Sequence, residues 1–393
     1  MSRKVAIVAV AQTKYEASNV NQSNSELLWE VTKKILEQTH LKFENQVQSG
    51  LCIDKILHCS EDFWQGRTIS DLTLHPEMGG FAMDVIKVPA DGTQAIYHAA
   101  MSILSGHDEV ILITGQRKES ETIRSTIENN AFDPIYLRPL GFDFLTAAAL
   151  QATRYMNKYG LTEEHFAKVA VKNRKNARNN PFARREKEIT IKDVMASKML
   201  SYPIKQLDSK PVADGACALV VASEDAAKKL TDKPVWITGL GNCYDAHYLG
   251  DRELSKSEAL ELAAKKAYKM AGIKNPRKEI NIAEISDEYS YQELLWAEGL
   301  GLCDEGKGGE MIAGGMTEIN GKLPVNTAGG LLSGLPSGVA GMAQTAEAFL
   351  QLQGNAGARQ VNGAQTALVQ GVTGPCGQSH CVIILNRRKG EIL

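Results

Sequence analysis

The chain has 393 residues, of which 43% are hydrophobic and 23% are charged, and its formal net charge at pH 7 is −2. This length suits two ordinary domains or one large duplicated core. The small net charge argues against a protein built mainly to bind nucleic acid or an anionic membrane. Since no apolar run approaches about eighteen residues, we expect no membrane-spanning helix.

The N-terminal pattern and the cysteines indicate the cellular compartment and whether this chain binds a metal ion. The sequence starts directly with a strand pattern and shows no signal-peptide pattern. The cysteines are scattered and form no CxxC pair, so we expect no metal site in this chain. Free thiols fit a reducing cytoplasm, where we expect the protein to act. The seven cysteines are Cys52, Cys59, Cys217, Cys243, Cys303, Cys376 and Cys381.

The first third of the chain predicts alternating strands and helices. Residues 4–12 read as a buried strand, and a helix with one apolar face follows over 25–38, with Ser25 as its cap. A strand over 53–59 comes next. A helix over 92–106 then begins with glycine and leads into a strand over 109–115.

The last third repeats this order. Strands are predicted over 234–240, 280–285 and 365–371, and helices over 257–270 and 341–354. Two copies of the same series of elements predict a duplicated α/β core.

Residues 117–205 interrupt the pattern and are helical, polar and basic. Between 168 and 192 there are nine Lys or Arg residues and two Glu residues. A buried strand over 215–222 then returns to the core. We therefore expect an N-terminal half (1–116 plus 206–232), an inserted basic lobe (117–205) and a C-terminal half (233–393).

A glycine-rich stretch over 326–341 precedes the last long helix. Five of its sixteen residues are glycine, including Gly329 and Gly330. Glycine allows close backbone approach, and the N–H groups at a helix start attract anions. This loop is the first candidate for a ligand-binding segment.

Several strings, in this order and at these spacings, resemble the thiolase superfamily, and more narrowly the sterol-carrier-protein type of thiolase. The resemblance covers essentially the whole chain and implies a duplicated five-layered αβαβα fold with an inserted helical lobe. The strings lie at 154–162, 179–181, 214–218, 293–303 and 326–330.

The resemblance also shows where chemistry is expected. Family thiolases cleave or form 3-oxoacyl-CoA, using a cysteine at the start of the first Gly-led helix. That position falls on Pro89, and Asp91 is better explained as a helix cap. The family's activating histidine falls on Leu335. The resemblance therefore predicts that the usual nucleophile and its base are missing.

The last glycine-rich loop contains Cys376 and His380, in the loop where the family has its second catalytic group. The two side chains could pair as thiol and base. Alternatively, Cys376 packs and His380 begins a strand. Cys381 is expected in the core. If the chain performs thiolysis, Cys376 is the candidate nucleophile.

The segment Asp287-Glu288-Tyr289 follows a predicted strand at the expected reaction centre. Some thiolase-fold proteins lack the acylated cysteine and act as acyl-CoA aldolases beside a small zinc-ribbon and OB-fold partner. A retro-aldol reaction needs a base for the 3-hydroxyl and a stabilised enolate. These three residues are candidates for the base, and loop N–H groups for the stabilisation. The alternative is a capped strand end with a packed tyrosine.

Coenzyme A is the implied substrate, and the basic lobe supplies candidate phosphate-binding residues. The alternative for each is a solvated helical face. We expect zinc in the partner rather than in this chain. The candidates are Lys172, Arg174, Lys175, Arg178, Arg184 and Arg185, with Gly329 and Gly330 in the loop.

Two functions from different classes remain open. In the first, the chain is an enzyme that cleaves or forms a carbon–carbon bond in an acyl-CoA; benzoylsuccinyl-CoA thiolase is one specialised example of the related proteins. Alternatively, it is a non-catalytic subunit that supports a second, complete thiolase chain. The resemblance implies a homodimer or a thiolase-like heterodimer, with the small subunit added.

Overall fold

A computed structural model describes residues 3–66, 69–184 and 187–389 of the chain. Within these ranges, nine strands form one mixed sheet in the order β3-β2-β4-β7-β1-β8-β11-β10-β9. The strands are β1 (Val5–Gln12), β2 (Lys55–Cys59), β3 (Asp84–Val88), β4 (Val110–Lys118), β7 (Asp214–Ser223), β8 (Val235–Tyr244), β9 (Ile282–Ile285), β10 (Thr366–Thr373) and β11 (Ser379–Asn386). A separate ribbon pairs β5 (Met199–Ser201) with β6 (Ile204–Lys205).

The helices are α1 (Asn24–Thr39), α2 (Asp62–Gln65), α3 (Gly92–Ser105), α4 (Arg124–Asn129), α5 (Phe144–Tyr159), α6 (Glu163–Ala177), α7 (Ile191–Ala196), α8 (Glu224–Leu230), α9 (Glu258–Ala271), α10 (Pro276–Glu279), α11 (Ser290–Gly299), α12 (Gly308–Ala313) and α13 (Ala340–Gln353).

Two similar half-sheets meet at the pairing of β1 with β8. Strand β2 runs parallel to β3 and β4, and β9 runs parallel to β10. The other pairings in the sheet are antiparallel. The parallel strands β2 and β4 and their counterparts β9 and β10 each need a helical crossover, which explains why long helices separate them in the sequence.

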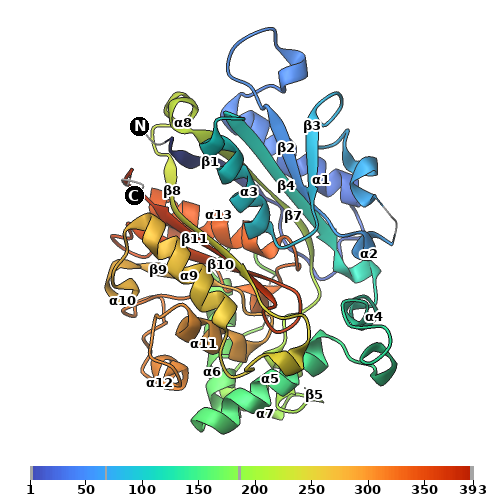
Figure 1. Cartoon of the computed structure of the whole chain (residues 1–393), viewed down its shortest axis with the longest axis vertical. Coiled ribbons are helices and arrows are strands. Elements are labelled where there is room, and N and C mark those ends of the chain that lie inside the picture. The colour runs from blue at the N-terminus through green and yellow to red at the C-terminus, as the bar shows by residue number, and fades with distance from the viewer. Residues whose placement is uncertain (1–2, 67–68, 185–186, 390–393) are drawn as a thin grey trace.

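Helices α3 and α13 lie between the two half-sheets and form the central layer (Figure 1). Their apolar faces, such as Ile96 of α3 and Met342 of α13, share one core with strands from both halves. Helix α1 covers the outer face of the first half-sheet, and α9 covers that of the second. The five layers confirm the predicted duplicated αβαβα fold.

The predicted helices and strands of both repeats are found within a few residues of their expected bounds. The predicted cap of α1 was wrong. Ser23, rather than Ser25, accepts a hydrogen bond from the Glu26 N–H, and the Glu26 side chain binds back to the Ser23 N–H. Asp91 does cap α3, because its side chain accepts from the Thr93 N–H at 3.0 Å. Strand β3 was not anticipated.

The inserted segment contains α4 to α7 and packs against the second half through α6 and α11. The Phe166 ring of α6 lies 5.8 Å from the Tyr291 ring of α11, centroid to centroid. The Lys172 ammonium of α6 lies 2.8 Å from the Glu293 carboxylate of α11. These contacts attach the lobe firmly to the C-terminal half, and the exact division into domains stays a prediction.

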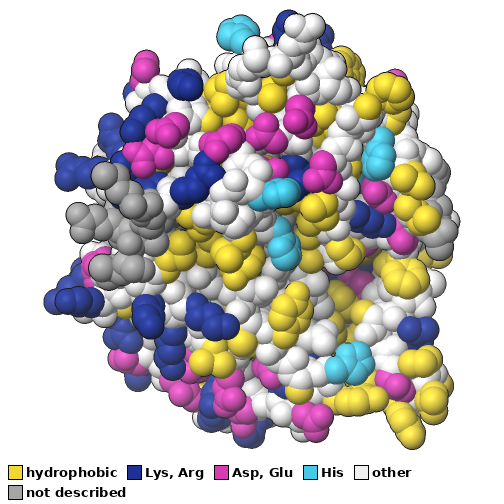
Figure 2. Space-filling view, turned by 45° about the horizontal axis from the view of Figure 1, so that its top comes forward, with side chains coloured by type: hydrophobic (Ala, Val, Ile, Leu, Met, Phe, Trp, Pro, Cys, Tyr) yellow, Lys and Arg dark blue, Asp and Glu magenta, His cyan; other side chains and the backbone are white. Residues whose placement is uncertain are grey.

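The surface mixes both signs of charge. Figure 2 shows acidic and basic side chains on one face, with exposed apolar side chains between them. This distribution agrees with the net charge of −2. Among the helices in the described ranges, none combines the length and the apolar character needed to cross a membrane.

Candidate active site

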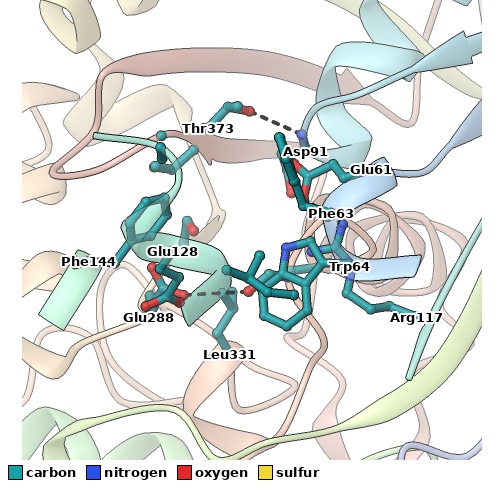
Figure 3. Close-up of a pocket in the computed structure, with 18 of the residues that line it drawn as sticks. Glu61, Phe63, Trp64, Asp91, Arg117, Glu128, Phe144, Glu288, Leu331 and Thr373 are labelled. Atoms are coloured by element: carbon teal, nitrogen blue, oxygen red, sulfur yellow. Dashed lines mark hydrogen bonds and ion pairs between the residues drawn. The ribbon is translucent and has the colours of Figure 1, made fainter. Parts of the chain in front are cut away.

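A cavity of about 240 Å³ opens where several parallel strands end (Figure 3). Its walls come from the residues after β2, the end of β4, the starts of α3 and α5, helix α4, the glycine-rich loop, and the segments at the ends of β9 and β10. In α/β sheets, ligands bind at the carboxyl ends of the strands, because the loops there converge. This cavity is therefore the candidate active site.

Carboxylic acids dominate the polar lining of the cavity. They are Glu61, Asp91, Glu128 and Glu288, joined by the cation Arg117. The hydroxyl groups of Ser286, Ser337 and Thr373 also line it. The described lining residues include neither a cysteine nor a histidine. This composition suits proton transfer rather than covalent catalysis by a thiol.

Arg124 organises two of these acids from behind the cavity wall. Its Nε donates to Glu128, and its Nη2 donates to Glu288 Oε1 at 2.6 Å. The pKa of Glu128 is raised to about 7, chiefly by burial and also by the charge of Glu288, while the charge of Arg124 opposes the rise. A carboxyl group with a pKa near 7 is well matched to general acid–base catalysis at neutral pH.

The sequence did not identify Glu128 as a candidate. Its spacing from Arg124 indicates only an (i, i+4) ion pair on a short helix, a common surface arrangement. Only the folding of α4 over the strand ends gives this pair its position.

Of the three consecutive candidates of the β9 turn, Glu288 and Tyr289 meet at Arg124, and Asp287 lies apart from them. Glu288 lines the cavity. The buried hydroxyl of Tyr289 accepts a hydrogen bond from Arg124 Nη2 at 3.3 Å. Asp287 is fully buried outside the cavity lining, where Oδ1 accepts from the Leu331 N–H at 2.6 Å and Oδ2 from Asn173 Nδ2 at 2.7 Å. Burial raises the pKa of Asp287, and the charge of Glu293 adds to the rise.

Buried acids of the same chain hold the glycine-rich loop in place. The N–H groups of Leu331, Ser337 and Gly341 donate to Asp287, Glu119 and Asp91 at 2.6, 2.8 and 3.0 Å, respectively. These three groups are therefore not available to stabilise an enolate, contrary to the expectation for the loop as a whole.

The loop's two paired glycines serve close packing within the chain. A Cβ on Gly330, whose φ is +61°, would lie 2.3 Å from the Asp287 carboxylate. One on Gly329 would lie 2.7 Å from Ala177. The space beside both glycines is thus filled by neighbouring residues, and the ligand contacts of Gly329 and Gly330 stay a prediction. Leu335 packs in a small core with Tyr15 and Leu331.

The structure does not bring Cys376 and His380 together as a pair. Nδ1 of His380 lies 2.9 Å from Gln370 Nε2, and Nε2 lies 3.0 Å from Ser257 Oγ. Burial lowers the pKa of His380 to about 3 and raises that of the Cys376 thiol to about 12. Both groups are neutral at physiological pH. His380 lies in β11, and Cys376 packs in an apolar cluster beside Phe132.

The six basic candidates of the lobe divide into different environments. Lys172 is buried and bonded to Glu293 and to the Val325 carbonyl, each at 2.8 Å, so it cannot reach a phosphate. Lys175 is exposed and lies 3.5 Å from Glu318. Arg185 lies outside the described residues.

The other three basic candidates line a second cavity of about 500 Å³, together with Asn179, Asn180 and Ser333. They are Arg174, Arg178 and Arg184. Since Leu331 lines the first cavity and Ser333 the second, the glycine-rich loop separates an acidic cavity from a basic one. In the described ranges, no group of three or more His, Cys, Asp or Glu side chains is placed to hold a metal ion.

Two half-sheets around a central helix layer, with a cavity at the strand ends, define the thiolase class of fold. Comparison with known families agrees. Residues 5–225 match the thiolase N-terminal domain, and residues 241–387 match the thiolase C-terminal domain. The chain belongs to the thiolase family, as its sequence strings indicated.

Relatives of known name are similar along much of the chain. Acetyl-CoA acetyltransferase of Methanothermobacter thermautotrophicus is 35% identical over 291 residues, which cover 73% of this chain and 76% of that protein. Human sterol carrier protein 2 is 31% identical over 393 residues, covering 93% and 69%. Subunit BbsB of benzoylsuccinyl-CoA thiolase from Thauera aromatica is 36% identical over 228 residues, covering 58% and 59%.

A solved structure extends the comparison to the fold as a whole. The Ltp2-ChsH2(DUF35) aldolase superimposes with a TM-score of 0.83 at 26% identity, and the match covers 98% of each chain. The relatives thus include acyltransferases, a thiolase subunit and an aldolase.

Proposed function

We propose that this chain is an acyl-CoA enzyme subunit that cleaves a carbon–carbon bond by a retro-aldol reaction, or forms it in reverse. The observation that carries the proposal is the cavity lining, which offers four carboxyl groups and, among the described residues, no thiol or imidazole. A retro-aldol reaction proceeds by proton transfer and requires no covalent intermediate. The similarity to an aldolase complex supports the same choice.

The cleavage uses Glu128 as the base. Its carboxylate takes the proton of the substrate's 3-hydroxyl group as the C2–C3 bond breaks. The oxygen becomes the carbonyl of the released ketone or aldehyde, and the bonding electrons move into the thioester as an enolate. The protonated Glu128 then returns its proton to C2, which yields the shorter acyl-CoA.

The neighbours of Glu128 tune this step. Arg124 binds Glu128, Glu288 and the Tyr289 hydroxyl at once, so it couples the charges of the group. Glu288 and Tyr289 act as positioning residues through Arg124. Asp287 holds the glycine-rich loop against the lobe and so keeps the cavity wall in place.

The basic cavity is proposed to hold the coenzyme. Guanidinium groups bind phosphates through paired hydrogen bonds, and Arg174, Arg178 and Arg184 surround this cavity. The acyl group would then pass beside the glycine-rich loop into the acidic cavity.

A small partner subunit completes the proposal. The aldolase neighbour is named as a complex with a DUF35 component, and BbsB is named as a subunit. We extend this to a zinc-ribbon and OB-fold partner for the present chain, around a homodimeric or thiolase-like heterodimeric core.

The discriminating experiment uses the purified chain, with and without the products of neighbouring genes. Retro-aldol cleavage of a 3-hydroxyacyl-CoA proceeds without free coenzyme A, whereas thiolysis of a 3-oxoacyl-CoA consumes it. Glu128→Gln should slow the first reaction by about 10²- to 10⁴-fold, and Glu310→Gln, at an exposed site, should not slow it. Activity on 3-oxoacyl-CoA that depends on free coenzyme A would refute the aldol mechanism.

The similarity to BbsB favours thiolysis as the second candidate function. A third outcome would support the non-catalytic alternative. In that case the chain is inactive with any small partner and gains activity only beside a second thiolase chain.

A further inference from the structure

The apolar walls of the acidic cavity include aromatic rings. Trp64 of α2 and Phe144 of α5 lie on opposite sides of the cavity, with the Glu128 and Glu288 carboxyl groups near the Phe144 side (Figure 3). Phe63, Ile127, Leu331 and Val372 add further apolar side chains to the lining. Aromatic side chains on two walls favour a flat apolar group between them, because ring contacts add to the gain from burying area.

The only cation among the described lining residues is already compensated. Nη2 of Arg117 donates to Glu61 Oε2 at 2.9 Å, and the guanidinium lies 4.8 Å from the centroid of the Trp64 ring. The Arg117 side chain is only 4% exposed. The Arg117 charge is therefore balanced by Glu61, and the guanidinium packs against the Trp64 ring. It is not positioned to bind a negatively charged ligand.

The remaining charges would also repel a carboxylate on the acyl group of the substrate. Arg124 is committed to Glu128 and Glu288. Asp91 accepts from the N–H groups of Thr93 and Gly341, each at 3.0 Å. A carboxylate entering this cavity would lose its hydration and meet acids whose cations are already paired.

We infer that the acyl group bound in this cavity is uncharged and contains a flat apolar ring, which lies between Trp64 and Phe144. This inference rests on the proposed function for the reaction, and it adds the class of substrate. It also names Trp64, Phe144 and the Glu61–Arg117 pair as the specificity-determining residues.

Binding of unreactive thioesters tests the inference without requiring turnover. The full chain is titrated calorimetrically with 3-phenylpropanoyl-CoA, hexanoyl-CoA and adipoyl-CoA, the last two differing in a terminal carboxylate. We expect the phenyl compound to bind about two- to ten-fold more tightly than hexanoyl-CoA. Adipoyl-CoA should bind at least about ten-fold more weakly than hexanoyl-CoA. Equal binding of all three would overturn the inference.

Two variants sharpen the test. Phe144→Ala should remove the preference for the ring, whereas Phe81→Ala, at a residue 81% exposed, should keep it. Glu61→Gln should leave the Arg117 charge unbalanced and narrow the difference in affinity between adipoyl-CoA and hexanoyl-CoA. Unchanged preferences in both folded variants would refute the assignment, and Glu61→Gln decides alone if Phe144→Ala fails to fold.

The outcomes separate the two proposals. If the thioesters bind with the expected order and no 3-hydroxyacyl-CoA is cleaved, the proposed reaction fails and the cavity's preference stands. If cleavage occurs with equal efficiency on phenyl, alkyl and carboxyalkyl substrates, the reaction stands and the inferred specificity is wrong.

Discussion

Replacing Glu128 by glutamine should change activity and stability in opposite directions at high pH. Burial raises the pKa of Glu128 from its ordinary 4.5 to about 7 in the folded protein. Between these two values the unfolded chain has lost the proton that the folded chain keeps. Stability therefore falls as the pH rises through this window, by about 3 kcal/mol in total.

Glu128→Gln removes this loss because the amide does not ionise. Relative to the wild type, the variant should gain about 3 kcal/mol of stability between pH 4.5 and 7, and the difference should stay constant above that. Below pH 4.5 the carboxyl is protonated in both states, so the pH contributes nothing there. The difference in the free energy of unfolding at any one pH also includes the lost ion pair with Arg124. The pH dependence of that difference is therefore the quantity to compare.

The catalytic consequence has the opposite sign. As a base, Glu128 must be ionised, so kcat/KM of the wild type should rise with pH through about 7 and then level off. The glutamine variant should lose this ascending limb and about 10²- to 10⁴-fold of the rate.

Urea unfolding and initial rates, both measured from pH 4 to 9, check the two effects on the same samples. Parallel stability curves for the wild type and Glu128→Gln would show that the carboxyl does not titrate near 7 in the folded protein. Retained activity with an unchanged pH profile would remove Glu128 from the mechanism.

Four further changes test the other assignments. Tyr289→Phe removes the acceptor of the Arg124 hydrogen bond, and turnover should fall with little change in KM; unchanged turnover would exclude a role for the hydroxyl. Cys376→Ala should keep turnover within about two-fold, because a thiol whose pKa is raised to about 12 is a poor nucleophile, and a large loss in a folded variant would restore the covalent route. Lys172→Met should lower stability in urea by about 3–5 kcal/mol, whereas Lys175→Met, 64% exposed, should change it by no more than about 0.5 kcal/mol; equal effects would contradict the burial of the Lys172 pair. Arg178→Gln should raise KM for the CoA ester and leave kcat unchanged, and an unchanged KM at low salt would argue against phosphate binding in the basic cavity.

The sequence by itself determined the fold. Apolar periodicity marks the strands and helices of both repeats, since each element must present one face to the core wherever it lies in the chain. The order of those elements then leaves few topologies, and the string resemblance selected the thiolase fold, which the comparisons confirm. The Asp91 cap was readable because a cap is a local interaction.

Only the tertiary structure decided which polar residues face the cavity. Lys172 and Lys175 lie in one helix with similar sequence surroundings, yet one is buried against Glu293 and the other is exposed. Asp287 and Glu288 are adjacent, yet only Glu288 lines the cavity. Sequence spacing cannot distinguish such neighbours, because the direction of each side chain depends on the elements packed against it.

The same reason explains why Glu128 was missed and why Cys376 and His380 looked like a pair. Glu128 gains its raised pKa from burial by segments remote in the sequence. His380 is held by Gln370 and Ser257, of which Ser257 belongs to a distant helix cap. Burial, hydrogen-bond partners and neighbouring charges are properties of the folded chain, and together they set the acidity on which the chemistry of this site depends.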